Sequence, residues 1–135
     1  MPDTGLTRRY AANVPAQATA GTGQTAIVAE IKTAGRVTEV AIQSAAAVAF
    51  NATNYRIFTL YNRGSDGSGT TVVATLDTSA VSLGDNDESL MTLSATAANL
   101  VVAANDILEI VETVAATGVA HGGYRIEVAA ASTTA

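Results

Sequence analysis

The stretch YNRGSDGSGTTVV, residues 61–73, combines glycines with an acidic side chain, as loops that hold phosphate or metal do. Gly64, Gly67 and Gly69 lie beside Asp66, but a Walker-type loop also needs a lysine after its last glycine, and none follows here. Such an anion site also opens a helix, whereas the following TVVATL favours a strand. Because Asn, Asp and Gly are turn formers, we predict that this stretch joins two strands as a β-hairpin.

Two further motifs match binding patterns only in part. GTGQTA, residues 21–26, has the spacing of a dinucleotide fingerprint, but neither a strand before it nor a helix after it is indicated. In GDNDES, Asp85, Asp87 and Glu88 offer oxygen ligands, yet their spacing is not that of an EF-hand calcium loop. We favour a solvated acidic turn over a weak cation site at Asp85 and Asp87.

Acid–base or nucleophilic chemistry would have to use His121, the only histidine in the chain. It lies in the glycine-rich segment GVAHGGY, without the G-x-S-x-G elbow of a serine hydrolase. Glu109 and Glu112 are separated by an odd number of residues, so on a strand they point to opposite faces. One histidine is too few for a histidine metal site, and there is no cysteine. We therefore predict that the protein is not an enzyme and binds no cofactor or metal ion.

The composition limits the kinds of partner. Seven basic residues against twelve acidic ones give a formal net charge of -5, whereas nucleic-acid binding needs clustered Lys and Arg. No apolar run approaches the ~18 residues that span a bilayer. We expect neither a nucleic acid nor a membrane as a partner. Ala and Val supply most of the 48% hydrophobic content and 4% of residues are aromatic, so the core is thin and an oligomer is favoured.

From Thr25 onward the sequence alternates with the period of two that is typical of half-buried strands. The alternation puts Ile27 and Ile31 on one face of the first strand and Val28 on the other, and we expect this strand to pair with the next one. The expected strands span residues 25–32, 36–44, 54–62, 70–76, 90–95, 106–114 and 123–130, with a loop or short helical turn and then a strand within residues 95–106. This pattern predicts an all-β fold, namely an antiparallel β-sandwich or jelly-roll-like domain.

The strand NYRIFTLYN is dense in β-branched and aromatic residues. Phe58 and Leu60 lie on one face, while Tyr55, Ile57 and Tyr61 lie on the other. Both faces are apolar, as expected of a sandwich strand whose outer face meets a neighbouring molecule. We therefore assign Tyr55, Ile57 and Tyr61 to a subunit interface.

Residues 1–24 show no strand or helix period and are rich in Ala, Thr, Gly and Gln. We expect an extended N-terminal arm, followed by a sandwich over residues 25–130 and a short tail over residues 131–135. The arm either lies along another surface or remains an unattached tail. If it is attached, Arg8, Arg9 and Tyr10 are its expected partner-binding residues.

Three segments, met in this order, resemble small virion proteins of tailed bacteriophages that decorate or cement the head. They are GRVTEVAIQSAAA, NATNYRIFTLYNRGSDGSGTTVVATLDTS and TLSATAANLVVAANDILEIVET. The resemblance covers residues 35–128, and its most specific parts are the hairpin NRGSDGSGTTVVA and the stretch from Leu100 to Glu109. Many such sequences read AAGD where this chain has Asn105 before Asp106, a change that a turn tolerates.

The resemblance implies a β-sandwich or jelly-roll-like domain on the outside of a capsid, made in the host cytoplasm and often trimeric. Its terminal arm would engage the major capsid protein or a neighbouring copy. The expected function is therefore a structural virion protein that bridges major capsid subunits, with the major capsid protein and further copies in a homotrimer as partners. The alternative is a receptor- or carbohydrate-binding sandwich of a phage fibre, spike or tail, because such β-modules are shared among virion parts.

Overall fold

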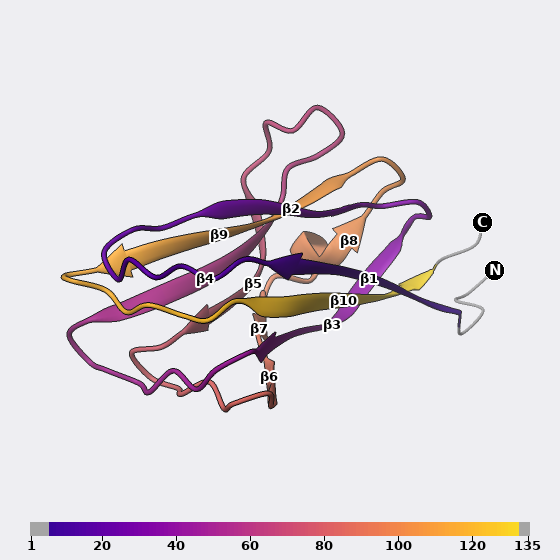
Figure 1. Cartoon of the computed structure of the whole chain (residues 1–135). Helices are drawn as coiled ribbons and strands as arrows, with labels where there is room; N and C mark the ends of the chain where they lie inside the picture. Colours follow the sequence, from indigo (N-terminus) through magenta and orange to yellow (C-terminus); the bar gives the residue numbers. More distant parts are fainter. Residues whose placement is uncertain (1–5, 133–135) are drawn as a thin grey trace.

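Two antiparallel sheets packed face to face make up the computed structural model, which describes residues 6–132 (Figure 1). The predicted all-β antiparallel sandwich is therefore confirmed. The strands are β1 (Thr7–Val14), β2 (Thr25–Glu30), β3 (Gly35–Ser44), β4 (Tyr55–Asn62), β5 (Thr71–Asp77), β6 (Glu88–Leu90), β7 (Thr92–Leu93), β8 (Val101–Val102), β9 (Ile107–Ala115) and β10 (Tyr124–Ser132). A 3₁₀ turn over Ala97–Leu100 leads into β8, as the sequence predicted.

The first sheet has the order β1-β10-β3-β6, with β8 also paired to β3. The second sheet has the order β2-β9-β4-β5-β7. The edge strands β1 and β2 run along the same side of the sandwich (Figure 1). Every strand pair is antiparallel. The backbone hydrogen bonds lie in the plane of each sheet, so both faces of each sheet are left to side chains.

Alternation along the central strands fills the space between the sheets. Val40 and Ile42 of β3 and Phe58 and Leu60 of β4 are at most 1% exposed. Strands β9 and β10 contribute aliphatic side chains in the same way, including Leu108, Ile110, Ile126 and Val128. Inward and outward residues therefore follow the period of two that the sequence showed.

The opening glycine-rich stretch is a hairpin loop between β4 and β5, as predicted. Gly64 and Gly67 have φ angles of 71° and 79°, which lie in the left-handed region that glycine adopts at low cost. The loop closes through the Gly69 N–H, which donates to the Arg63 carbonyl over 2.7 Å. Asp66 accepts from the Ser68 backbone and hydroxyl, so its carboxylate is used within the turn.

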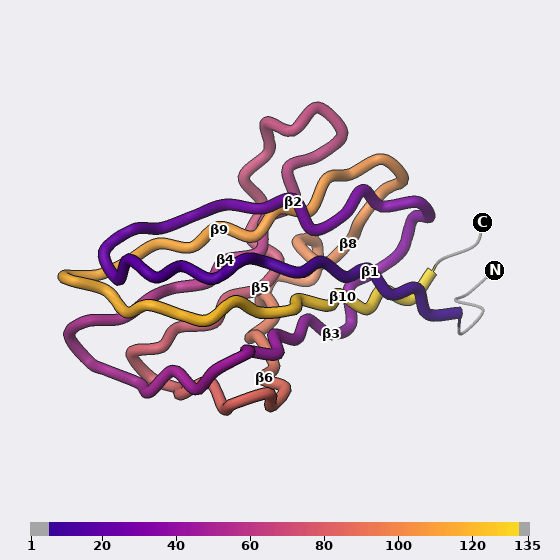
Figure 2. Tube along the Cα trace, viewed as in Figure 1, coloured from indigo at the N-terminus to yellow at the C-terminus, as the bar shows by residue number. Residues whose placement is uncertain are grey.

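The structure changes the expected boundary between arm and sandwich. Residues Thr7–Val14 are extended, but they form β1, which pairs with β10 along its whole length. Figure 2 shows these first and last strands side by side, with both ends of the described chain at one end of the sandwich. The sandwich thus begins well before residue 25, and it ends later than expected, because β10 includes Ala131 and Ser132 of the expected tail. Residues 1–5 of the expected arm and 133–135 of the expected tail lie outside the described part of the chain.

Two expectations about β2 are wrong. It does not pair with β3, because β2 joins β9 in the second sheet while β3 joins β10 in the first. A bulge between Ile27 and Ala29 also shifts the alternation. As a result Ile31 is buried together with Val28, and not on the same face as Ile27, whose side chain is 59% exposed on the outer face.

Candidate functional site

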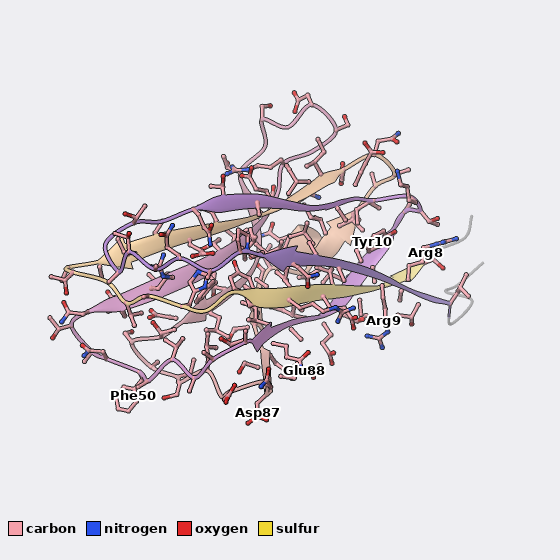
Figure 3. The ribbon with its side chains drawn as sticks, in the orientation of Figure 1. Arg8, Arg9, Tyr10, Phe50, Asp87 and Glu88 are labelled. Atoms are coloured by element: carbon pink, nitrogen blue, oxygen red, sulfur yellow. The ribbon has the colours of Figure 1, made fainter. Side chains whose placement is uncertain are left out.

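The three residues that the sequence assigned to partner binding lie together on β1 but in different surroundings (Figure 3). Arg8 is exposed, and no ion pair involves it among the described residues. Arg9 is paired with Glu127 on β10 over 2.9 Å. Tyr10 packs against the core, and its hydroxyl accepts from the Lys32 N–H. Arg8 is thus the one of the three without an ion-pair partner in this part of the chain, and the Arg9 side chain, although paired, is still 58% exposed.

The outer face of the second sheet carries the residues that the sequence assigned to a subunit interface. Tyr55, Ile57 and Tyr61 are half-buried on the solvent side of β4. Strand pairing sets further apolar side chains beside them on the same face. We call this set the apolar patch; its members are Ile27, Tyr55, Ile57, Tyr61, Val72 and Val111. The patch extends over four neighbouring strands and is a broad surface rather than a groove. The Glu109–Arg63 ion pair interrupts it, because Glu109 lies between Ile27 and Tyr61 and the Arg63 guanidinium lies 4.3 Å from the centre of the Tyr61 ring.

The acidic turn before β6 is solvated, as we favoured from the sequence. Asp85, Asp87 and Glu88 are exposed, and Figure 3 shows Asp87 and Glu88 at the edge of the first sheet. Asn86 takes a left-handed φ of 58° between them. Within residues 6–132 no three His, Cys, Asp or Glu side chains gather closely enough to hold a metal ion.

A buried polar network lies at the opposite end of the sandwich from the chain ends, and its centre is Arg56 on β4. All five N–H groups of its guanidinium have acceptors. The Val119 carbonyl accepts from Nε and Nη2, the Thr22 carbonyl and Glu112 accept from Nη1, and the Ala20 carbonyl accepts from Nη2. Arg56 therefore ties the loop before β2 and the loop before β10 to the second sheet.

Glu112 on β9 is the acidic partner in this network. Its Oε1 lies 3.1 Å from Arg56 Nη1 and 2.7 Å from His121 Nε2. Its Oε2 accepts from the Tyr124 hydroxyl over 2.8 Å and from Gln24 Nε2 over 3.0 Å. Both oxygens are filled, so Glu112 anchors neighbouring groups and has no position left for a substrate.

The surroundings set the protonation states of the network. Burial raises the pKa of Glu112, but hydrogen bonds from His121, Tyr124 and Gln24 hold it below its ordinary value overall. Burial and the Glu112 charge raise the pKa of Tyr124, which keeps its hydroxyl proton. The Gly123 N–H donates to His121 Nδ1, so Nε2 carries the proton that reaches Glu112.

A glycine fixes the approach of the two loops that Arg56 ties together. Gly118 has a φ of 65°, and a Cβ there would collide with the Ala20 carbonyl that accepts from Arg56. The loop before β10 can therefore lie against the loop before β2 only if residue 118 has no side chain.

A shallow depression of about 420 Å³ opens on the outer face of the first sheet. Its polar lining comes from Asn13, Gln43, Asn86 and Arg125, over a floor that includes Gly123. The Arg125 guanidinium is also paired with Glu127 over 2.9 Å. Amide and guanidinium groups at one place could hydrogen bond a polar ligand, although no exposed aromatic ring lines the depression.

Arg56 is not among the residues that the sequence singled out, and Glu112 had no role assigned to it there. It placed Glu109 and Glu112 on opposite faces, and this is confirmed, because Glu109 pairs with Arg63 at the surface while Glu112 is buried. The sequence did carry a signal, because Arg56 is two residues before Phe58 and so points to the same, inward face of the strand as Phe58 and Leu60. A charged side chain at such a position needs a buried partner of opposite charge.

We compared the chain with known protein families, curated proteins and solved structures. No family model matches the chain, and no match was found among curated proteins or solved structures. In the described part of the chain, no helix has the length and apolar character needed to cross a membrane.

Proposed function

We propose that this protein is a structural virion protein that decorates and cements the outer surface of a tailed-phage capsid by bridging major capsid subunits. The observation that carries the proposal is the apolar patch on the second sheet. A broad and largely apolar face on a small β-sandwich, interrupted by one ion pair, is the kind of surface that a large protein contact covers. The resemblance to decoration proteins supplies the identity of the partner, the major capsid protein.

The mechanism is mechanical. Each copy buries roughly 1,000–2,000 Å² against two capsid subunits, so their separation exposes that area to water and becomes costly. We assign this contact to the apolar patch, because Arg9 and Tyr10 are engaged within the chain. Copies also associate with one another, as a homotrimer in the form that the resemblance implies. No cofactor, metal ion, nucleic acid or membrane takes part.

The test uses expanded capsids that lack the protein. Added wild-type protein should co-sediment with them and raise the temperature at which they break. Ile27→Asp, which places a charge in the apolar patch, should weaken co-sedimentation at least about tenfold, because a buried charge without a partner is costly.

The matched control is Val101→Asp on the first sheet, since Val101 and Ile27 are exposed to similar extents, 56% and 59%. This control should bind like wild type. Equal binding by Ile27→Asp and wild type, with both folded by circular dichroism, contradicts the assignment of the patch.

A second candidate function is a receptor- or carbohydrate-binding sandwich of a fibre, spike or tail. The polar depression around Asn13 and Arg125 favours it, because sugar hydroxyls accept hydrogen bonds from amide and guanidinium N–H groups and donate them to amide oxygens. In this case the protein should bind bacterial surface polysaccharides, and Asn13→Ala with Arg125→Ala should abolish that binding. A decoration protein keeps its capsid binding in the same double variant.

A further inference from the structure

The first sheet ends in two strands that pair on one side only. Among residues 6–132, β1 pairs with β10 and β6 pairs with β3, and neither has a second neighbour in the sheet. Such an edge presents backbone N–H and C=O groups to which another strand can add.

The register shows which residues present these groups on β1. The Ser132 N–H donates to the Leu6 carbonyl over 2.8 Å, and residues of an antiparallel pair alternate between bonded and non-bonded positions. The pairing of β1 with β10 continues from there without a shift. The backbone groups of the odd-numbered residues Thr7, Arg9, Ala11 and Asn13 therefore point away from β10.

The same reasoning applies to β6. The Met91 N–H donates to the Val40 carbonyl over 2.8 Å, which makes Ser89 opposite Ile42 the next bonded pair. The backbone groups of Glu88 and Leu90 therefore point away from β3. Leu90 is 60% exposed, and its side chain is open to a neighbour.

The two edges differ in charge. Arg8 and Arg9 make the β1 edge basic, whereas Asp87 and Glu88, with Asp85 in the preceding turn, make the β6 edge acidic (Figure 3). No cation is paired with these three acidic side chains in the described part of the chain. Pairing β1 with another β1, or β6 with another β6, brings like charges together, and only β1 beside β6 joins opposite charges.

We propose that copies of this chain associate head to tail, with β1 of one copy adding to β6 of the next so that the first sheet continues from copy to copy. The inference deepens the self-association included in the proposed function and rests on that part of it. The register that places Arg9 opposite Glu88 also places Thr7 opposite Leu90. The backbone N–H and C=O groups of all four residues point toward the other strand, so both pairs can form hydrogen bonds.

The faces of the joined sheet agree with this pairing. Arg9 lies on the outer face, where it meets Glu127, because Tyr10 and Ala12 point to the core. Glu88 lies on the outer face as well, because it is opposite Gln43 between the inward Val40 and Ile42. Directly opposed residues of an antiparallel pair share a face, so Arg9 and Glu88 meet without turning either sheet over.

A contact of this type uses two different surfaces, so it closes into a ring if the rotation between copies allows and otherwise continues as an open row. It also leaves the apolar patch on the second sheet uncovered for the capsid.

The experiment measures the mass of the protein in solution by sedimentation equilibrium. The average mass of the wild-type protein should rise as its concentration is increased, because copies associate. Arg9→Glu and Glu88→Arg should each raise the dissociation constant at least about tenfold, because each makes the contact repulsive. The two changes combined in one chain exchange the charges of the edges and should restore association to within about threefold of wild type. Arg36→Glu is the control: Arg36 is exposed on β3, which has a neighbouring strand on both sides there, so this variant should associate like wild type.

Cysteine cross-linking tests the geometry directly, because the chain has no cysteine of its own. Opposed residues at a bonded antiparallel position have Cα atoms about 5.5 Å apart, which suits a disulfide. A mixture of Arg9→Cys and Glu88→Cys proteins should form a mixed disulfide under mild oxidation, whereas neither protein alone should.

Three results overturn the inference: a wild-type protein that stays monomeric to roughly 1 mM, a double charge exchange that fails to restore association, or cross-linking by Arg9→Cys alone. Capsid binding is measured separately. Head-to-tail association in a protein that does not bind capsids overturns the proposed function and leaves this inference standing. Capsid binding by a protein that does not associate does the reverse.

Discussion

At the scale of single residues, Arg56 and Glu112 form a buried ion pair that fastens two loops to the sandwich. Neither side chain is exposed to solvent. Such a pair stabilises little relative to apolar residues, but removal of one partner leaves a buried charge uncompensated. The network therefore fixes where the loops lie more than it adds to the free energy of unfolding.

This reasoning predicts the effect of Glu112→Gln. The change keeps the size of the side chain and removes its charge, which leaves Arg56 as an unpaired buried cation, so the free energy of unfolding should fall by about 3 kcal/mol or more. Urea denaturation measures it. Glu109→Gln is the control on the same strand, because its pair with Arg63 is partly exposed and should contribute no more than ~1 kcal/mol. Similar losses in both variants would contradict the buried role of Glu112.

At the scale of elements, β1 is an integral strand whose alternate backbone groups serve different purposes. Because Leu6 is hydrogen-bonded to Ser132 of β10, every second residue from Leu6 onward is bonded to β10 as well. The Ala12 N–H therefore points toward β10 and the Ala11 N–H toward the open edge. The side chains follow the same alternation, because Ala12 packs against the core and Ala11 is exposed. Neighbouring positions on one strand should therefore respond differently to the same substitution.

Proline tests this difference, because it lacks the backbone donor. Ala12→Pro should lower the free energy of unfolding by about 1–3 kcal/mol, since it removes a bond to β10. Ala11→Pro should cost less, because its N–H faces solvent, and it should also weaken self-association at the β1 edge. Thermal unfolding and sedimentation measure the two effects. A larger loss of stability in Ala11→Pro would show that the assigned phase of β1 is wrong.

At the scale of the whole molecule, the sandwich is built from pairings that are distant in sequence. Arg9 and Glu127 are 118 residues apart, and β1 and β10 depend on each other. Folding that needs such pairings is slow, because the loop must close before any contact stabilises it. Refolding from urea, followed by stopped-flow fluorescence, should occupy milliseconds to seconds. A microsecond phase carrying the whole amplitude would contradict this expectation.

The distance between paired strands also explains what the sequence could predict. The strands and the hairpin over residues 62–71 follow from local alternation and turn residues, and Asn105, a turn former, adopts a left-handed φ of 76° in the turn before β9. Partner choice is not local, which is why β2 was matched to β3 and β1 was taken for an arm. The outward parity of Tyr55, Ile57 and Tyr61 was readable, whereas the Arg56–Glu112 contact required knowing that β4 lies beside β9.

The partnership of β1 and β10 has a consequence for synthesis. A ribosome synthesises residues 7–14 early and residues 124–132 more than a hundred codons later, so β1 cannot form its sheet pairing until β10 has been made. Until then the inward-facing side chains of β1, Tyr10, Ala12 and Val14, have no partner strand beside them. The sandwich can therefore be completed only after β10 has been synthesised.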